Sequence, residues 1–166
     1  LEDVSSDAEL MQRELRKAGL QFNAVLTDTK DGFVEQLEKF RPDIILSDYN
    51  LPSFDALGAL DIVKENNPDM PFIIISGSIG EELAVELLKR GANDYLLKDR
   101  IAKLGPAVER ALRDARKSRQ LKQIQYDLNA RSLDLEASKS KIDEALRTSE
   151  RSRLALLSVL EDQNKT

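Results

Sequence analysis

The chain has 166 residues, 25 Lys and Arg against 30 Asp and Glu for a net charge of −5, and neither Cys nor His. It can therefore hold no disulfide, no thiolate or imidazole metal site, no Ser-His-Asp triad and no phospho-accepting histidine, and any metal must have oxygen ligands, which suit Mg²⁺, Mn²⁺ or Ca²⁺. The acidic balance argues against nucleic acid or anionic lipid as a partner, and the lack of a signal peptide or a membrane-length apolar run predicts a cytoplasmic protein.

The first hundred residues alternate short apolar runs with stretches of helical periodicity. The runs are short and rich in β-branched or aromatic residues, which predicts strands at Phe22–Leu26, Ile44–Leu46, Phe72–Ile75 and Tyr95–Leu97. Helical spacing between them predicts helices at Ala8–Ala18, Gly32–Phe40, Ala56–Asn66 and Glu81–Arg90. This alternation predicts a parallel sheet covered by helices on both faces, with its functional site at the carboxyl ends of the strands.

The remaining residues have a different composition. All Gly and Pro lie at or before Pro106, and the net charge changes from −9 over residues 1–100 to +4 over residues 101–166. A heptad column consists of Leu121, Leu128, Leu135 and Ile142, and the companion column three residues further on contains Ile124, Arg131, Ser138 and Ala145. The pattern predicts one long helix over residues 104–162, with a tail at 163–166, that forms a coiled-coil homodimer of parallel or antiparallel orientation. A solvated single helix or a helical hairpin is the alternative, and the lack of Gly and Pro disfavours the hairpin.

Polar side chains stand where four of the predicted strands end. They are Glu2 and Asp3 after Leu1, Asp48, Ser76 followed by Gly77, and Lys98. Taken singly, such residues are usually turn formers, helix caps or solvated cations. Together they would meet at one edge of a parallel sheet, where three mutually repelling carboxylates suit a hard dication such as Mg²⁺. Asp48 could then attack phosphorus, while Mg²⁺ and Lys98 neutralise the transferring group and Ser76 donates a hydrogen bond to it.

The same stretches resemble the receiver domain of two-component response regulators. The matching segments are residues 1–3, 42–52, 73–77 and 91–98, and the resemblance extends over about residues 1–115. It implies an α/β, flavodoxin-like (βα)5 fold, a doubly wound parallel sheet of strand order 2-1-3-4-5. The receiver core would comprise residues 1–103, and the last helix would continue as the coiled coil.

The resemblance implies a role for each residue of the set. Asp48 would be the phosphoacceptor, and the Mg²⁺ ligands would be Glu2, Asp3, Asp48 and the backbone carbonyl of Asn50. Lys98 would contact the phosphoryl group, Ser76 would be the catalytic and switch hydroxyl, and Tyr95 the switch aromatic. The donor would be a histidine kinase or a histidine phosphotransfer protein. No turnover is expected of this chain beyond self-phosphorylation and autodephosphorylation at Asp48.

Both ends of the chain suggest a larger protein. Only Leu1 precedes the acidic pair, so we expect upstream residues to supply most of the first strand. Receivers joined to a coiled coil resemble parts of multi-domain signalling proteins, hybrid histidine kinases among them, in which PAS, kinase or cyclase modules follow. Phosphorylation would then be relayed through the last helix into the dimer and on to an output domain.

Three other functions are open. A haloacid-dehalogenase-type phosphohydrolase also uses a strand-end Asp, a hydroxyl and a Lys, but Asn50 stands where that family needs a second Asp. The basic stretch at residues 110–122 precedes the heptads as in some DNA-binding proteins, yet acidic residues interrupt it, which favours a solvated helix face. A pseudo-receiver that is never phosphorylated could act as a dimeric scaffold, although the complete acidic set argues against it.

Overall fold

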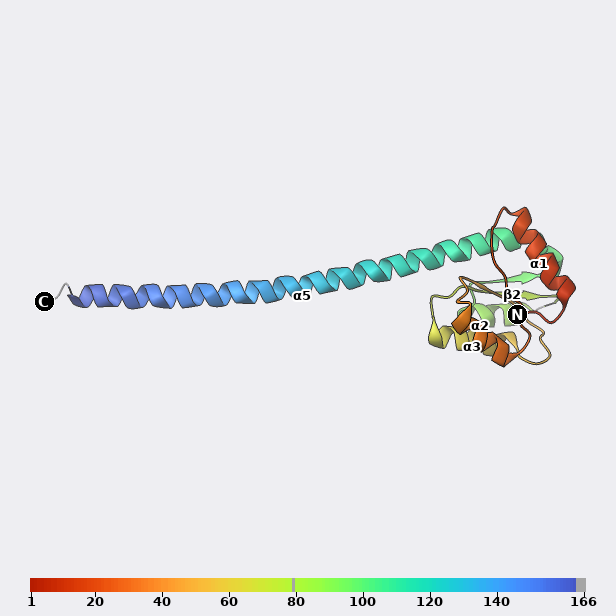
Figure 1. The fold of residues 1–166 in the computed structure, drawn as a ribbon, viewed down its shortest axis with the longest axis horizontal. Coiled ribbons are helices and arrows are strands. Elements are labelled where there is room, and N and C mark those ends of the chain that lie inside the picture. Colours follow the sequence, from red (N-terminus) through yellow and green to blue (C-terminus); the bar gives the residue numbers. More distant parts are fainter. Residues whose placement is uncertain (79, 164–166) are drawn as a thin grey trace. The chain divides into compact units, whose positions relative to one another are not determined.

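The computed structural model describes residues 1–78 and 80–163, and the chain divides into two compact units, Leu1–Arg119 and Gln120–Thr166. The elements, in chain order, are α1 (Ser5–Lys17), α2 (Lys30–Lys39), β1 (Ile45–Asp48), α3 (Ala56–Asn66), β2 (Phe72–Ser76), α4 (Glu81–Lys89), β3 (Asp94–Leu97), the 3₁₀ helix η1 (Lys98–Lys103) and α5 (Leu104–Gln163) (Figure 1). The predicted alternation of strands and helices is confirmed, and so is the long final helix.

The first unit is built on a parallel sheet of strand order β1-β2-β3. Ile45 pairs with Phe72 and Ile73 pairs with Asp94, so the three strands run in step and end at one edge. Each strand is reached from the previous one through a helix, as parallel pairing requires. The flavodoxin-like class is therefore confirmed.

The strand predicted at Phe22–Leu26 is wrong, because residues 20–28 have no regular secondary structure. Leu1 does sit beside β1: its backbone nitrogen donates to Leu46 O at 2.7 Å, and Asp48 N donates to Leu1 O at 2.9 Å. Glu2 N in turn donates to Thr27 O at 3.2 Å. The spatial order of these segments is that of the predicted sheet, and an apolar cavity of about 170 Å³ lined by Leu1, Phe22 and Ile45 lies there.

Successive side chains of β2 point to opposite faces of the sheet and belong to two separate apolar clusters. Phe72 and Ile74 point into a cluster that includes buried side chains of α2, α3 and α4, whereas Ile73 and Ile75 point into one formed with α1 and α5. All four side chains are fully buried. A Cβ placed on Gly105 would lie 2.3 Å from the Ala18 Cβ, so the absence of a side chain lets α5 approach the end of α1.

The second unit consists of the part of α5 beyond Arg119. Its heptad residues are all exposed in this single chain: Leu121, Ile124, Leu128, Leu135 and Ile142. The structure contains one chain, so the predicted homodimer stays a prediction. In the part of the chain that the structure describes, no helix combines the length and hydropathy needed to cross a bilayer.

Candidate functional site

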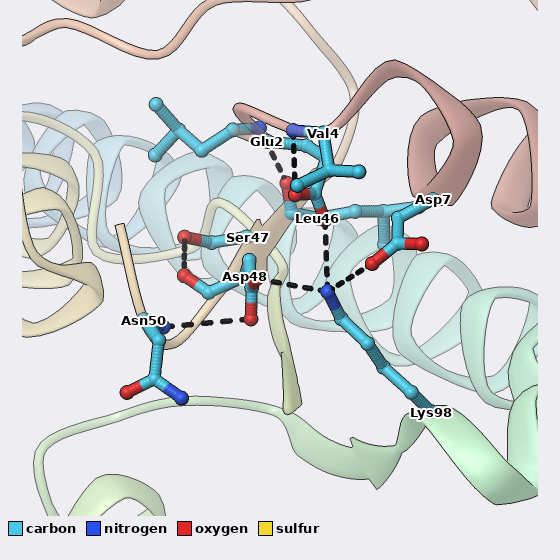
Figure 2. A network of polar contacts seen from close by, with 9 residues as sticks. Glu2, Val4, Asp7, Leu46, Ser47, Asp48, Asn50 and Lys98 are labelled. Atoms are coloured by element: carbon cyan, nitrogen blue, oxygen red, sulfur yellow. Dashed lines mark hydrogen bonds and ion pairs between the residues drawn. The ribbon is translucent and has the colours of Figure 1, made fainter. Parts of the chain in front are cut away.

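The polar residues predicted at the strand ends lie at the carboxyl edge of the sheet. Asp48 is the last residue of β1, and Lys98 is the first residue of η1, directly after β3. Glu2 and Asp3 immediately precede α1 and are held next to β1 by the hydrogen bonds of Leu1. Figure 2 shows Glu2, Asp48 and Lys98 pointing toward one another from these three segments.

Lys98 is the centre of the cluster. Its Nζ donates to Asp48 Oδ2 at 2.9 Å, to Glu2 Oε2 at 3.4 Å, and to Asp7 Oδ2 (Figure 2). Burial by itself lowers the pKa of Lys98, but the hydrogen bonds to Asp7 and Asp48 outweigh it and hold that pKa above its usual range. The lysine is therefore a firmly charged ammonium that links α1, β1 and the start of η1.

Glu2 is buried, with 2% of its surface exposed. Burial is the main reason why the pKa of Glu2 is raised; the Val4 N–H, which donates to Oε1 at 3.1 Å, opposes the shift, and the charge of Asp48 adds to it. The surrounding hydrogen bonds and charges therefore do not fully offset the cost of burying the ionised carboxylate. Such a group favours a cation beside it.

Glu2, Asp3 and Asp48 offer carboxylate oxygens that all lie within 4.8 Å of one another. With Asp7 there are four carboxylates around a single ammonium, which leaves an excess of negative charge at this edge. Oxygen ligands of this kind fit Mg²⁺ in number and chemistry. The residues present therefore fit the metal that the sequence predicted.

The Asp48 carboxylate is 5% exposed and is fixed by its neighbours. The Asn50 N–H donates to Asp48 Oδ1 at 3.4 Å, while Lys98 holds the other carboxylate oxygen. The Ser47 hydroxyl donates to the backbone carbonyl of Asp48 at 3.0 Å. One oxygen of the carboxylate is consequently bound by a cation and the other only by a long hydrogen bond.

Of the remaining predicted residues, Ser76 and Tyr95 make no hydrogen bond or ion pair with Lys98 or the carboxylates around it in the part of the chain that the structure describes, whereas Asn50 contacts Asp48. Ser76 ends β2 at the same edge, but its hydroxyl donates to the Ser78 carbonyl at 3.0 Å. Tyr95 lies in β3, is partly buried, and packs against the apolar cluster shared with α2, α3 and α4. Asn50 is exposed, and it is its N–H that contacts Asp48.

The sequence analysis missed Asp7. This residue lies in the first turn of α1, four residues after Asp3, and its carboxylate contacts Lys98. The signal was present, because the first turn of a helix that follows a strand faces the same edge of the sheet as the strand end. The helix predicted from the sequence begins only at Ala8, so Asp7 was assigned neither to that helix nor to the site.

Comparison with known proteins identifies the family of this chain. The response regulator receiver domain family matches residues 1–109. The luminescence regulatory protein LuxO of Vibrio campbellii is 35% identical over 118 residues, which cover 70% of this chain and 26% of LuxO. The transcriptional regulator NtrC of Escherichia coli is 32% identical over 138 residues, 81% of this chain and 28% of NtrC. The crystal structure of the NtrX receiver domain of Brucella abortus has a TM-score of 0.58 at 27% identity, covering 68% of this chain and 94% of that one.

The chain belongs to the response regulator receiver domain family. It is a phosphoacceptor module of two-component signalling, a class whose members generally bind Mg²⁺ and take their phosphoryl group from a histidine kinase or a phosphotransfer protein. The chain spans about a quarter of the length of the curated relatives it matches, 26% for LuxO.

Proposed function

We propose that Asp48 is the phosphoacceptor of this chain, with Glu2, Asp3, Asp48 and the Asn50 carbonyl as the Mg²⁺ ligands. The observation that carries the proposal is the position of Asp48: a buried carboxylate at a strand end, 2.9 Å from the Lys98 ammonium and within 4.8 Å of two further carboxylates. A lone strand-end Asp caps a turn, whereas this one faces both a cation and an acidic cluster.

The reaction needs few groups. An oxygen of Asp48 attacks phosphorus, the bond from phosphorus to the donor imidazole nitrogen breaks, and the imidazole leaves with the bonding electron pair and takes up a proton. Mg²⁺, when bound, supplies charge neutralisation for the phosphoryl oxygens. Lys98 would supply a second positive charge, since its Nζ already lies beside Asp48 Oδ2.

Two residues near the site would respond to the new charge. The Ser76 hydroxyl can exchange the Ser78 carbonyl for a phosphoryl oxygen, which is a stronger, charged acceptor. Tyr95 is partly buried on β3, the strand that leads directly to Lys98, and its ring would turn inward when Ser76 moves toward the phosphoryl group. These movements would constitute the switch.

The route to an output runs through α5. Lys98 is the first residue of η1, which ends at Lys103, and α5 begins at the next residue, Leu104. The first turns of α5 are packed on the sheet through Leu104, Val108 and Ala111. A displaced Lys98 would therefore alter how α5 packs, and the exposed heptads beyond Arg119 would convey the change within a coiled-coil homodimer to a following domain.

The test is intact-mass spectrometry after incubation with Mg²⁺ and acetyl phosphate. We expect one Mg²⁺-dependent phosphoryl adduct in the wild type and none in Asp48→Ala. The matched control is Asp43→Ala, which removes an exposed carboxylate just before the opposite end of the same strand. It should be phosphorylated like the wild type.

An unmodified wild type whose circular dichroism shows a folded protein would contradict the proposal. In that case the chain would be a pseudo-receiver, acting only as a dimeric scaffold. An adduct that persists in Asp48→Ala would place the phosphoacceptor elsewhere.

A further inference from the structure

Among the described residues of the site, the Asp7 carboxylate contacts Lys98. The lysine ammonium has three N–H donors, and its three acceptors come from separate segments: Glu2 before α1, Asp7 in α1 and Asp48 in β1 (Figure 2). All of the donors are engaged before any phosphoryl group arrives.

Asp7 differs from the other two acceptors in its surroundings. Glu2 and Asp48 belong to the group of carboxylates that can share a metal ion, and Asp7 does not belong to that group. The Asp7 side chain is 31% exposed, whereas the side chains of Glu2 and Asp48 are 2% and 8% exposed. Its carboxylate therefore draws the ammonium toward α1, away from the carboxylates that take part in the reaction.

We propose that Asp7 is a positioning residue that competes with the incoming phosphoryl group for Lys98. The inference rests on the proposed phosphorylation of Asp48. A phosphoryl oxygen can gain an N–H of Lys98 only when one of the present acceptors gives it up, and Asp7 is the acceptor that plays no other part at the site.

The variant Asp7→Asn tests the competition, because the amide keeps the size of the side chain but not its charge. We expect the apparent KM for acetyl phosphate to fall about threefold, the size of effect typical of a partly exposed ion pair. The maximal rate should change little, since Lys98 would contact the phosphoryl group equally in the bound donor and in the transition state.

The matched control is Glu9→Gln, which removes one negative charge from the same helix at an exposed position. Its KM should equal that of the wild type. The decisive comparison is between Lys98→Met and the double variant that also contains Asp7→Asn. If Asp7 acts through the lysine, these two proteins have the same KM. A direct repulsion between Asp7 and the donor would persist there.

A second readout needs no phosphoryl donor. Proton exchange of the Lys98 ammonium with water, followed by nitrogen-15 NMR, should be faster in Asp7→Asn than in the wild type, because one of its three acceptors is weakened. A purely structural role of Asp7 in α1 would leave this exchange unchanged.

An unchanged or raised KM in Asp7→Asn, an equal fall in Glu9→Gln, or a fall that persists with Lys98→Met would each overturn the inference. The proposed function fails separately: its failure is a folded wild type that takes up no phosphoryl group at all, and the inference then falls with it.

Discussion

Two stretches of α5 contain similar apolar residues in opposite environments. In its first turns Leu104 is fully buried and Val108 is 3% exposed, because the helix lies on the sheet. Beyond Arg119, Leu121 and Leu128 are 67% and 55% exposed. The difference shows that helical periodicity marks a surface to be covered but does not say what covers it. The receiver supplies its own core, whereas the proposed coiled coil would have to cover the distal heptads with a second helix.

The largest effect is expected from the distal heptads. Replacing both Leu121 and Leu128 with Asn should raise the dissociation constant of the proposed homodimer by more than about a hundredfold, because each chain would lose two apolar contacts with its partner helix. The control is Leu133→Asn, at a residue that is equally exposed, at 67%, but lies outside the heptad columns. Sedimentation equilibrium would measure both. An unchanged dimer in the double variant would refute the coiled coil.

The receiver core provides the converse perturbation. Leu60 in α3 is fully buried, so Leu60→Ala should lower the free energy of unfolding by about 3 kcal/mol. The same substitution at Leu88 in α4, which is 43% exposed, should cost less than about 1 kcal/mol. Urea unfolding followed by tyrosine fluorescence would compare the two. Equal losses would mean that the apolar cluster around α3 is not packed as described.

The third prediction concerns Glu2 without Mg²⁺. Its pKa in the folded protein lies above the ordinary value of 4.5, so the ionised side chain costs stability at neutral pH. We expect Glu2→Gln to raise the melting temperature of the metal-free protein by about 3 °C at pH 7. As the pH falls through the raised pKa, Glu2 of the wild type becomes protonated, and the difference in melting temperature between the two proteins disappears. Calorimetry at several pH values would measure it, with Glu9→Gln as the control that should show no gap.

Adding Mg²⁺ should reverse the order of the melting temperatures of the wild type and Glu2→Gln. The ion should raise the melting temperature of the wild type and have little effect on Glu2→Gln, which lacks one of the proposed ligands. A Mg²⁺ response of equal size in the two proteins would exclude Glu2 from the metal site.

The smallest effect is expected at the junction of the two regions. Ser118 lies just before the end of the first unit, and its hydroxyl donates to Asp69 Oδ1 at 3.1 Å, which ties α5 to the turn before β2. Ser118→Ala should cost about 0.5 kcal/mol. Hydrogen exchange of the backbone amides near residue 118 should quicken, while those near Leu104 keep their protection. Equal changes along both stretches would mean that the contact does not mark the end of the packed part of α5.

Much of the fold could be predicted because its signals are local. The helix Ala56–Asn66 has the predicted bounds, and Asp55 caps it by accepting the Gly58 N–H at 2.7 Å. The meeting of Asp48 and Lys98 also followed from the sequence, since parallel strands end at one edge. The hydrogen-bond partner of the Ser76 hydroxyl could not be predicted from the sequence. Its acceptor is the Ser78 carbonyl, and the position of that carbonyl depends on the path of the turn.

The sequence by itself determined the alternating α/β class and the long final helix, because the periodicity of apolar residues is a property of neighbouring residues. Tertiary structure decided that residues 22–26 form no strand and that Asp7 contacts Lys98. A strand forms only where a partner from another part of the chain supplies backbone hydrogen bonds, and the local sequence does not show whether it does. Asp7 and Lys98 are 91 positions apart, so only the packing of α1 against the sheet brings the carboxylate to the ammonium.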